Sequence, residues 1–421
     1  GDFRGIWRAA TYPWHTTNLR PTALESVHCP RRTSLGGVLH SGNVSVSVRE
    51  LTSGEVLAFL SARADQPLQQ RPSFAEVKAE WDHLFLGFFD ADRAGGRTLI
   101  GSALVLLRRL PRTRASLAYL PEGPVLDWTS RDVEDCLRAL LAELRRRRCF
   151  LVKIGPRLAV RRWSAATVKA AIGDPRVHRL RDVPADEVLP AANLASRLAA
   201  AGWRQYEAAG PGFGGTLQPR YGFEVALAGR DLPSVRAGLS PQWRRNITRA
   251  GKRGLIVERG GFDQLAEFHP LLIASGERGG FVPRDLRYYQ RMWHSMADED
   301  PGLLSLYLGR HQGQAHAGML LVASGDRHSY TYGGSDTAGR DLRPSNAVQW
   351  RMLADAHEAG ASVFDLRGVS DALAEEDPEI GLMRFKVGLG GDAVEYLGEW
   401  DYFVRPVLAR AFTTYWNRRP H

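Results

Sequence analysis

The sequence predicts an α/β protein with two domains of similar organisation, and three observations support this fold class. The chain has 421 residues, which is more than one typical domain contains. Hydrophobic residues make up 44% of it and charged residues 24%, as in ordinary globular proteins. Strand-like and helix-like segments alternate in the same order in both halves, which indicates mixed sheets covered by helices. We expect an irregular extension over residues 1–42, a first domain over 43–219 and a second over 220–396.

The first domain is predicted from apolar periodicity and from capping signals. Thr52 or Ser53 precedes an apolar helical pattern, with Glu55 available in its first turn, so a helix is expected to begin there. A glycine-bearing acidic turn between two apolar runs predicts a β-hairpin. The predicted elements are a strand at 43–49, a helix after 53, a helix near 74–81, a hairpin of 84–89 with 98–109, a strand at 116–119, a helix from 130 or 132 to 148, and a strand at 150–154.

The second domain repeats this alternation and ends in a glycine-rich turn. The predicted elements are strands at 221–228 and 255–259, helices at 241–253, 262–275 and 283–296, a hairpin of 303–310 with 314–323, a strand reaching 330–336, a crossover helix from 344 to about 359, and a strand at 362–366. Loops at one edge of such a unit converge. Phe385 and Lys386 are expected at the lip of that edge, where a partly desolvated cation can stabilise negative charge developing in a reaction.

Charge and composition narrow the classes of partner. Lys and Arg number 56 against 46 Asp and Glu, giving a net charge of +10 and a pI of about 9.8. This excess suits a polyanion such as nucleic acid, although arginine- and alanine-rich chains are often basic without such a partner. Cys29, Cys136 and Cys149 have no disulfide or zinc spacing, and the histidines show no metal-ligand spacing, so no metal is expected. The longest apolar run, 99–107, is too short to span a membrane and no signal peptide is apparent, so a cytoplasmic protein is expected.

Five segments with distinctive motifs lie in order along the chain: Phe-Ala-Glu-Val-Lys at 74–78, Ala-Tyr-Leu-Pro-Glu-Gly-Pro-Val-Leu-Asp at 118–127, Tyr-Gly-Gly-Ser at 332–335, Phe-Asp-Leu-Arg-Gly at 364–368 and Phe-Lys at 385–386. Together they resemble the FemABX family of aminoacyl-tRNA-dependent peptidyltransferases. The resemblance covers residues 43–405. It implies two tandem GNAT-like domains joined across a cleft, with residues 397–421 returning to complete the first domain. It also implies transfer of an amino acid from aminoacyl-tRNA to the amine of a peptide or peptide-like acceptor, with no further cofactor.

The resemblance assigns the reaction centre to Lys386 and Phe385. Lys386 would contact the terminal ribose of the tRNA or the developing oxyanion, Phe385 would shape the pocket around it, and Tyr332 would point its phenol into the cleft. Aminolysis of an ester passes through a tetrahedral oxyanion, which a preorganised cation stabilises. Taken without the resemblance, a lysine after a core phenylalanine is usually a surface residue.

The resemblance also assigns residues to the acceptor, and the charge of one helix suggests residues for the tRNA. Arg284 and Tyr288, four residues apart and so expected on one helix face, would bind the diphosphate and sugar-peptide of the acceptor, and Lys78 would contact its phosphate. The basic helix is the candidate for tRNA phosphates, although most charge runs are solvated helix faces. Its four candidate residues are Arg244, Arg245, Arg249 and Lys252.

One departure from the family pattern affects the acceptor. Family members acting on the cell-wall nucleotide precursor often carry an aromatic residue followed, after four others, by Asp-Pro; here Phe150 lacks a hydroxyl and Gly155 replaces the carboxylate. The acceptor is therefore expected to be either a peptidoglycan precursor or an amine of a secondary metabolite. Two alternatives remain: an acetyl-CoA-type N-acyltransferase, although the Arg/Gln-x-x-Gly-x-Gly/Ala turn that cradles a pyrophosphate has no match here, and a non-catalytic RNA-binding protein.

Overall fold

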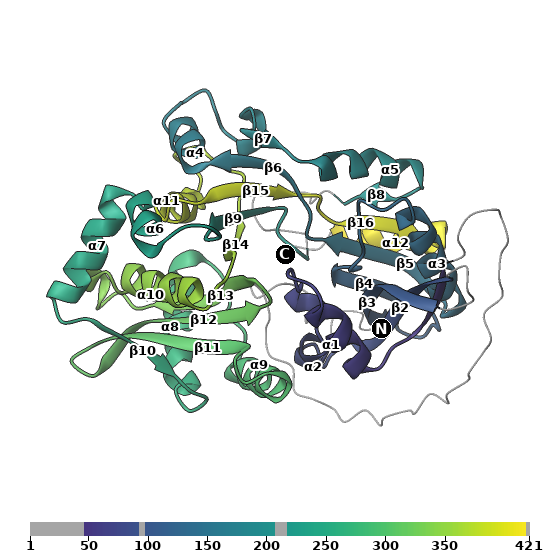
Figure 1. Cartoon of the computed structure of the whole chain (residues 1–421), viewed down its shortest axis with the longest axis horizontal. Coiled ribbons are helices and arrows are strands. Elements are labelled where there is room, and N and C mark those ends of the chain that lie inside the picture. Colours follow the sequence, from purple (N-terminus) through teal and green to yellow (C-terminus); the bar gives the residue numbers. More distant parts are fainter. Residues whose placement is uncertain (1–45, 92–96, 207–216, 418–421) are drawn as a thin grey trace.

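The fold consists of two mixed β-sheets that lie side by side, each with its own helices (Figure 1). The computed structural model describes residues 46–91, 97–206 and 217–417, so the predicted extension at 1–42 lies outside the described residues. Within these ranges, no helix combines the length and the apolar composition that crossing a membrane requires.

The first sheet has seven strands, which pair antiparallel except for the parallel pair β4 and β5. Its order is β1 (Ser47–Glu50), β2 (Asp82–Ala91), β3 (Arg97–Arg109), β4 (Ser116–Glu122), β5 (Cys149–Pro156), β16 (Trp400–Phe403) and β8 (Arg204–Gln205).

The second sheet has nine strands, of which β13 and β14 pair in parallel and the other neighbours antiparallel. Its order is β10 (Ile256–Gly260), β11 (Leu304–His311), β12 (Gln314–Ser324), β13 (Arg327–Ser335), β14 (Val363–Val369), β9 (Tyr221–Ala226), β15 (Asp392–Tyr396), β6 (Ala159–Ser164) and β7 (Glu187–Val188).

Helices cover the sheets and connect their strands. The α-helices are α1 (Ser53–Ser61), α2 (Pro72–Val77), α3 (Val133–Arg146), α4 (Ala165–Ile172), α5 (Leu194–Ala200), α6 (Leu232–Gly238), α7 (Pro241–Lys252), α8 (Leu265–Gly279), α9 (Leu286–Glu299), α10 (Pro344–Glu358), α11 (Ile380–Val387) and α12 (Pro406–Asn417). Short 3₁₀ segments are η1 (Leu68–Gln70), η2 (Leu180–Asp182), η3 (Pro190–Asn193) and η4 (Arg340–Leu342).

Local sequence signals explain where several helices begin. Thr52 caps α1 and forms a capping box with Glu55, as the sequence predicts. The side chain of Asp285 accepts a hydrogen bond from the backbone N of Tyr288 and so fixes the start of α9. Helix α3 packs against β5 and buries leucines three and four residues apart, which is the pattern of an amphipathic helix: Leu137, Leu140, Leu141 and Leu144.

Sheet membership differs from the predicted division of the chain in one place. Strands β6 and β7 lie before residue 220, yet they pair in the nine-stranded sheet through β15. Strand β16 pairs with β5 and β8 in the seven-stranded sheet, so the end of the chain does return to the first sheet. Strand β6 pairs with β15, which lies more than 200 residues later in the sequence. Neighbouring residues therefore gave no indication of this pairing.

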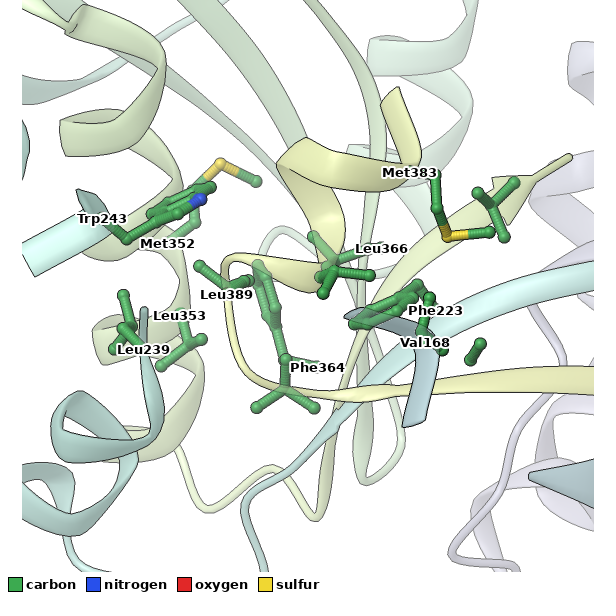
Figure 2. Packing of buried hydrophobic residues seen from close by; sticks show 14 of the residues in the cluster. Val168, Phe223, Leu239, Trp243, Met352, Leu353, Phe364, Leu366, Met383 and Leu389 are labelled. Atoms are coloured by element: carbon green, nitrogen blue, oxygen red, sulfur yellow. The ribbon is translucent and has the colours of Figure 1, made fainter. Parts of the chain in front are cut away.

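The largest core cluster packs around the nine-stranded sheet and holds α11 in place (Figure 2). Ile380, Met383 and Val387 are the buried apolar face of α11. Phe385 and Lys386 therefore stand on a helix, not in the glycine-rich turn that the sequence predicted at their position. The turn itself begins at Gly388, where a Cβ would overlap the ring of Trp243, and it was this run of glycines that obscured the end of the helix.

Candidate functional site

A cavity of about 220 Å³ opens between the two halves of the molecule. Its walls come from η1, α2, β3 and β4 on one side, and from α8, α9, β13, β14 and α11 on the other. Helix α2 packs directly against α9 where the halves meet (Figure 1). The buried ion pair of Arg71 and Glu299, with Nε and Oε1 2.6 Å apart, joins these two helices. Five predicted site residues line the cavity: Lys78, Arg284, Tyr288, Tyr332 and Lys386.

Lys386 is the cation at the β14 side of this cavity. Its residue is 4% exposed, and its Nζ donates to the carbonyl oxygens of Leu366 at 2.8 Å, Gly368 at 2.5 Å and Arg367 at 3.5 Å. Three acceptors match the three donors of an ammonium group and favour the protonated form. The nitrogen therefore faces the β14 carbonyls and not bulk solvent, in a residue that lines the cavity.

The surroundings of Lys386 bring its proton affinity into the neutral range. Burial lowers the pKa of Lys386 to about 7, the charge of Asp365 opposes this fall, and the charge of Arg367 adds to it. An ammonium group with such a pKa can both carry charge and exchange a proton near neutral pH.

A bulge in β14 presents the three carbonyls. The register of β14 against β9 shifts between Asp365 and Gly368, and Arg367 adopts a left-handed φ of 60°. The carboxylate of Asp365 accepts from the backbone N of Arg367 at 2.7 Å and so holds the bulge closed. Strand β14 thus turns its carbonyls away from the sheet and toward α11.

Tyr288 and Tyr332 form the centre of the opposite wall. Their hydroxyl oxygens lie 3.1 Å apart, and burial raises the pKa of Tyr288 to about 12, so its phenol stays protonated at neutral pH. The guanidinium of Arg284 lies 5.4 Å from the centre of the Tyr288 ring, and the Nζ of Lys78 lies 5.6 Å from it. Two cations and two phenols therefore converge on one part of the cavity.

The helical argument for Arg284 was wrong, although Arg284 does line the cavity. Helix α9 begins at Leu286, because Asp285 caps it, so Arg284 precedes the helix and shares no helical face with Tyr288. The two side chains meet because Arg284 folds back over the tyrosine ring.

Phe385 does not reach the cavity. Its ring packs against Trp243 of α7, with centroids 4.7 Å apart, and the indole Nε1 of Trp243 donates to the carbonyl of Phe385 at 3.1 Å. The side chains of Phe385 and Lys386 leave α11 in different directions, as neighbours on a helix do, so the predicted pocket-shaping role of Phe385 has no geometric support.

The basic helix α7 stands apart from the cavity, whose lining includes none of its residues. Arg245, Arg249 and Lys252 are exposed on α7. Arg244 is half-buried and donates to the carbonyls of Ala237 and Leu239 at 2.6 and 2.8 Å, so it closes the end of α6. Three of the four predicted tRNA-binding residues are therefore available on the surface, and Arg244 serves the fold.

Sequence reasoning missed the residues around the β14 bulge. Arg367 and Gln69 line the cavity, and Glu122 binds both of them. Two of the five segments that resemble the family, 118–127 and 364–368, contain Glu122 and Arg367. The sequence does not reveal that these two residues are in contact. At the altered position, a Cβ on Gly155 would overlap the amide of Gln218, which donates to the Gly155 carbonyl at 2.9 Å.

Among the residues that the structure describes, no three His, Cys, Asp or Glu side chains gather as metal ligands would. The described cysteines, Cys136 and Cys149, are buried free thiols whose pKa burial raises to about 12. Neither thiol is therefore a ready nucleophile at neutral pH.

Two mixed sheets with helices around a shared cavity define a two-part α/β protein, which is the fold class that the sequence predicts. The crystal structure of FemX has the same fold, with a TM-score of 0.70, 20% sequence identity, and coverage of 87% of this chain and 99% of FemX. The FemAB family matches residues 51–301 and 309–416. The chain belongs to the FemAB family.

Curated relatives of the chain include two proteins called lipid II:glycine glycyltransferase. The protein from Staphylococcus saprophyticus is 23% identical over 83% of this chain and 91% of its own length. The protein from Staphylococcus aureus is 22% identical over 85% of this chain and 93% of its own length.

Proposed function

We propose that this chain is an aminoacyltransferase that moves an amino acid from aminoacyl-tRNA to the amine of a peptide or peptide-like acceptor. Family membership supports the class of reaction, and relatives named as glycyltransferases support an amino acid as the group that is transferred. The observation that carries the proposal is the buried ammonium of Lys386 in a cavity shared by both halves of the molecule.

The reaction needs one new bond and one broken bond. The acceptor amine attacks the ester carbonyl, a C–N bond forms, and the bond from that carbon to the ribose oxygen breaks. The amine loses a proton and the ribose oxygen gains one. Lys386 would donate a hydrogen bond to the oxyanion or to the leaving oxygen, and its weakest internal bond, 3.5 Å to the Arg367 carbonyl, is the one that it can exchange most easily. Because the tRNA ester is already activated, the proposal includes no further cofactor.

The opposite wall would bind the acceptor. Arg284 and Lys78 offer positive charge to phosphate groups, and Tyr288 and Tyr332 offer hydroxyls. Lipid II is the first acceptor to test because the relatives are named for it. The side chain of Gln218 occupies the space beside Gly155, where the family pattern has a carboxylate. Acceptor recognition can therefore differ here, and a secondary-metabolite amine is the second candidate.

The charged tRNA would approach along α7. Arg245, Arg249 and Lys252 are exposed there, and the net charge of +10 attracts a polyanion. Trp243 of α7 contacts Phe385 of α11. A tRNA bound to α7 would therefore lie on a helix that packs directly against the helix carrying Lys386. The proposal places the reaction in the cytoplasm, where charged tRNA is made.

The test is a transfer assay with the full chain, a pool of charged tRNAs and candidate amines, read by mass spectrometry of the acceptor. We expect a mass increase of one aminoacyl residue with at least one pair, with glycyl-tRNA and lipid II tried first. Lys386→Met should abolish most of this product, and Lys169→Met, at an exposed lysine of α4, should not. Absence of an aminoacyl adduct with every pair, or full activity of Lys386→Met, would contradict the proposal.

A further inference from the structure

Glu122 and Arg367 are two unusual residues that bind each other beside the cavity, which Arg367 lines. Neither is glycine, yet Glu122 has a φ of 51° and Arg367 a φ of 60°, in the left-handed region that side chains disfavour. Nη1 of Arg367 donates to Oε1 of Glu122 at 2.8 Å, and their side chains are 16% and 2% exposed. Strained backbone that persists on both partners of one buried contact indicates a constraint beyond packing.

The carboxylate of Glu122 connects both walls of the cavity. Its Oε1 binds Arg367 of β14, and its Oε2 accepts from the backbone N of Gln69 at 3.2 Å. Gln69 belongs to η1, which leads into α2 and so to Lys78 at the end of that helix. One side chain at the end of β4 is therefore tied to the strand that presents carbonyls to Lys386 and to the segment that carries Lys78.

The charges around this contact are permanent at neutral pH. Burial opposes ionisation of Glu122, but the charges of Arg367 and Arg157 outweigh it and lower the pKa of Glu122 below its usual value. Asp365 and Arg367 on β14 are the charged groups that act on Lys386. Glu122 on β4, Arg157 after β5 and Arg327 on β13 in turn face these two groups.

We propose that Glu122 is a positioning residue for Lys386. By holding Arg367, it fixes the β14 bulge whose carbonyls bind the Lys386 ammonium, and it balances the positive charge of Arg367, which acts on that ammonium. The inference rests on the proposed function only for its effect on turnover, because the state of Lys386 can be measured without any substrate.

An ion pair that serves only stability is the competing explanation, since removing one partner of a buried pair destabilises a protein wherever it lies. The two explanations differ in what Lys386 experiences. Without the charge of Glu122, the charge of Arg367 beside Lys386 is opposed less strongly, because the carboxylate of Asp365, 3.7 Å from Nη1 of Arg367, is shared with Arg157 and Arg327. The pKa of Lys386 must then fall further, whereas loss of a merely structural pair leaves it unchanged.

The experiment is a ¹³Cε-lysine NMR titration of the full chain. Five lysines give at most five signals, and Lys386→Met identifies the one of interest: Lys78, Lys153, Lys169, Lys252 and Lys386. We expect Glu122→Gln to lower the Lys386 midpoint by about half a pH unit or more. We also expect it to reduce kcat roughly tenfold to a hundredfold, with a smaller change in KM, because the ammonium is misplaced.

Asp355→Asn is the matched control. Asp355 is also a buried carboxylate bound by arginines, Arg259 and Arg351, but none of these residues lines the cavity. Its loss should lower stability and leave the Lys386 midpoint and kcat near their wild-type values. Glu122→Asp keeps the charge on a shorter arm and should give values between wild type and Glu122→Gln.

The outcomes separate this inference from the proposed function. A Lys386 midpoint in folded Glu122→Gln equal to that of the wild type overturns the inference, whatever the activity. If Glu122→Gln does not fold, Glu122→Asp decides: a smaller shift in the same direction supports the inference, and wild-type values for both midpoint and kcat overturn it. A shifted midpoint in a protein that transfers nothing would support the inference and refute the proposed function.

Discussion

Two groups of cations, one in the cavity and one on α7, differ in surroundings far more than in charge. Lys386 is buried, binds three carbonyls and has a pKa lowered to about 7. Arg245, Arg249 and Lys252 are exposed to water on α7. Burial lowers the pKa of a lysine toward neutral pH and strengthens its electrostatic interaction with a reacting group. An exposed cation is screened by water and salt, so it attracts a polyanion but stabilises a reacting group little. Under the proposed function, the first group would serve catalysis and the second would bind tRNA.

The largest effect should come from removing the buried cation. Lys386→Met should lower the single-turnover rate of aminoacyl transfer about a hundredfold to a thousandfold, the range found when one oxyanion donor is removed. Lys169→Met supplies the control, because Lys169 is an exposed lysine outside the cavity lining. A loss below threefold for Lys386→Met would erase the distinction between the two groups.

Arg284→Ala should weaken the acceptor and not the donor. We expect the KM for a phosphate-bearing acceptor to rise about tenfold to a hundredfold, because a charge-assisted hydrogen bond is worth about 1.5–3 kcal/mol, while the KM for charged tRNA stays constant. Steady-state kinetics with each substrate varied in turn measures this. Arg287→Ala is the matched control, since Arg287 is an exposed neighbour outside the cavity lining. Equal KM values for Arg284→Ala and wild type would remove Arg284 from the acceptor site.

Burial of Lys386 should appear in the pH dependence of stability. The pKa of this lysine is about 7 in the folded protein and higher in the unfolded chain, so between these values the unfolded chain binds more protons. The free energy of unfolding of the wild type, relative to Lys386→Met, should therefore rise as pH increases above about 7, by at most about 1.4 kcal/mol per pH unit. Denaturant unfolding from pH 7 to 9 measures this, and Lys169→Met should show no such slope. A flat difference would mean that Lys386 is not desolvated.

The smallest effect should come from the exposed group. Replacing Arg245, Arg249 and Lys252 together by Gln should raise the KM for charged tRNA less than tenfold at low salt and reduce its salt dependence, with kcat unchanged. The double variant Arg145→Gln, Arg148→Gln, in a second exposed basic run, is the control. If both variants change the KM for tRNA equally, α7 has no special part in binding.

Much of the fold could be predicted from local sequence signals. The elements that were not predicted depend on contacts between distant parts of the chain. Capping at Thr52 and the alternation of apolar runs gave the order of strands and helices. The pairing of β6 with β15 joins segments more than 200 residues apart, so no local pattern encodes it. Helix α11 escaped detection because Gly381 and the glycines from 388 onward resemble a turn, while its helical state depends on burial of Met383 and Val387.

The site could be predicted in part because family resemblance supplied what periodicity could not. Lys386, Lys78, Arg284, Tyr288 and Tyr332 all line the cavity. The predicted pocket-shaping role of Phe385 lacks support because adjacent residues of a helix point in different directions, and Phe385 packs on Trp243. The contact of Glu122 with Arg367 spans 245 residues and links two strained positions, and only the folded chain reveals it.

The most direct test of the account is the ratio of wild-type to Lys386→Met single-turnover rates between pH 6 and 9. Both proteins act on the same acceptor amine, so its titration cancels and the ratio reports Lys386 alone. If the ammonium form of Lys386 stabilises the reaction, the ratio stays constant below about pH 7 and then falls roughly tenfold per pH unit. A ratio that is flat across this range, or one that rises with pH, would contradict a catalytic ammonium at Lys386.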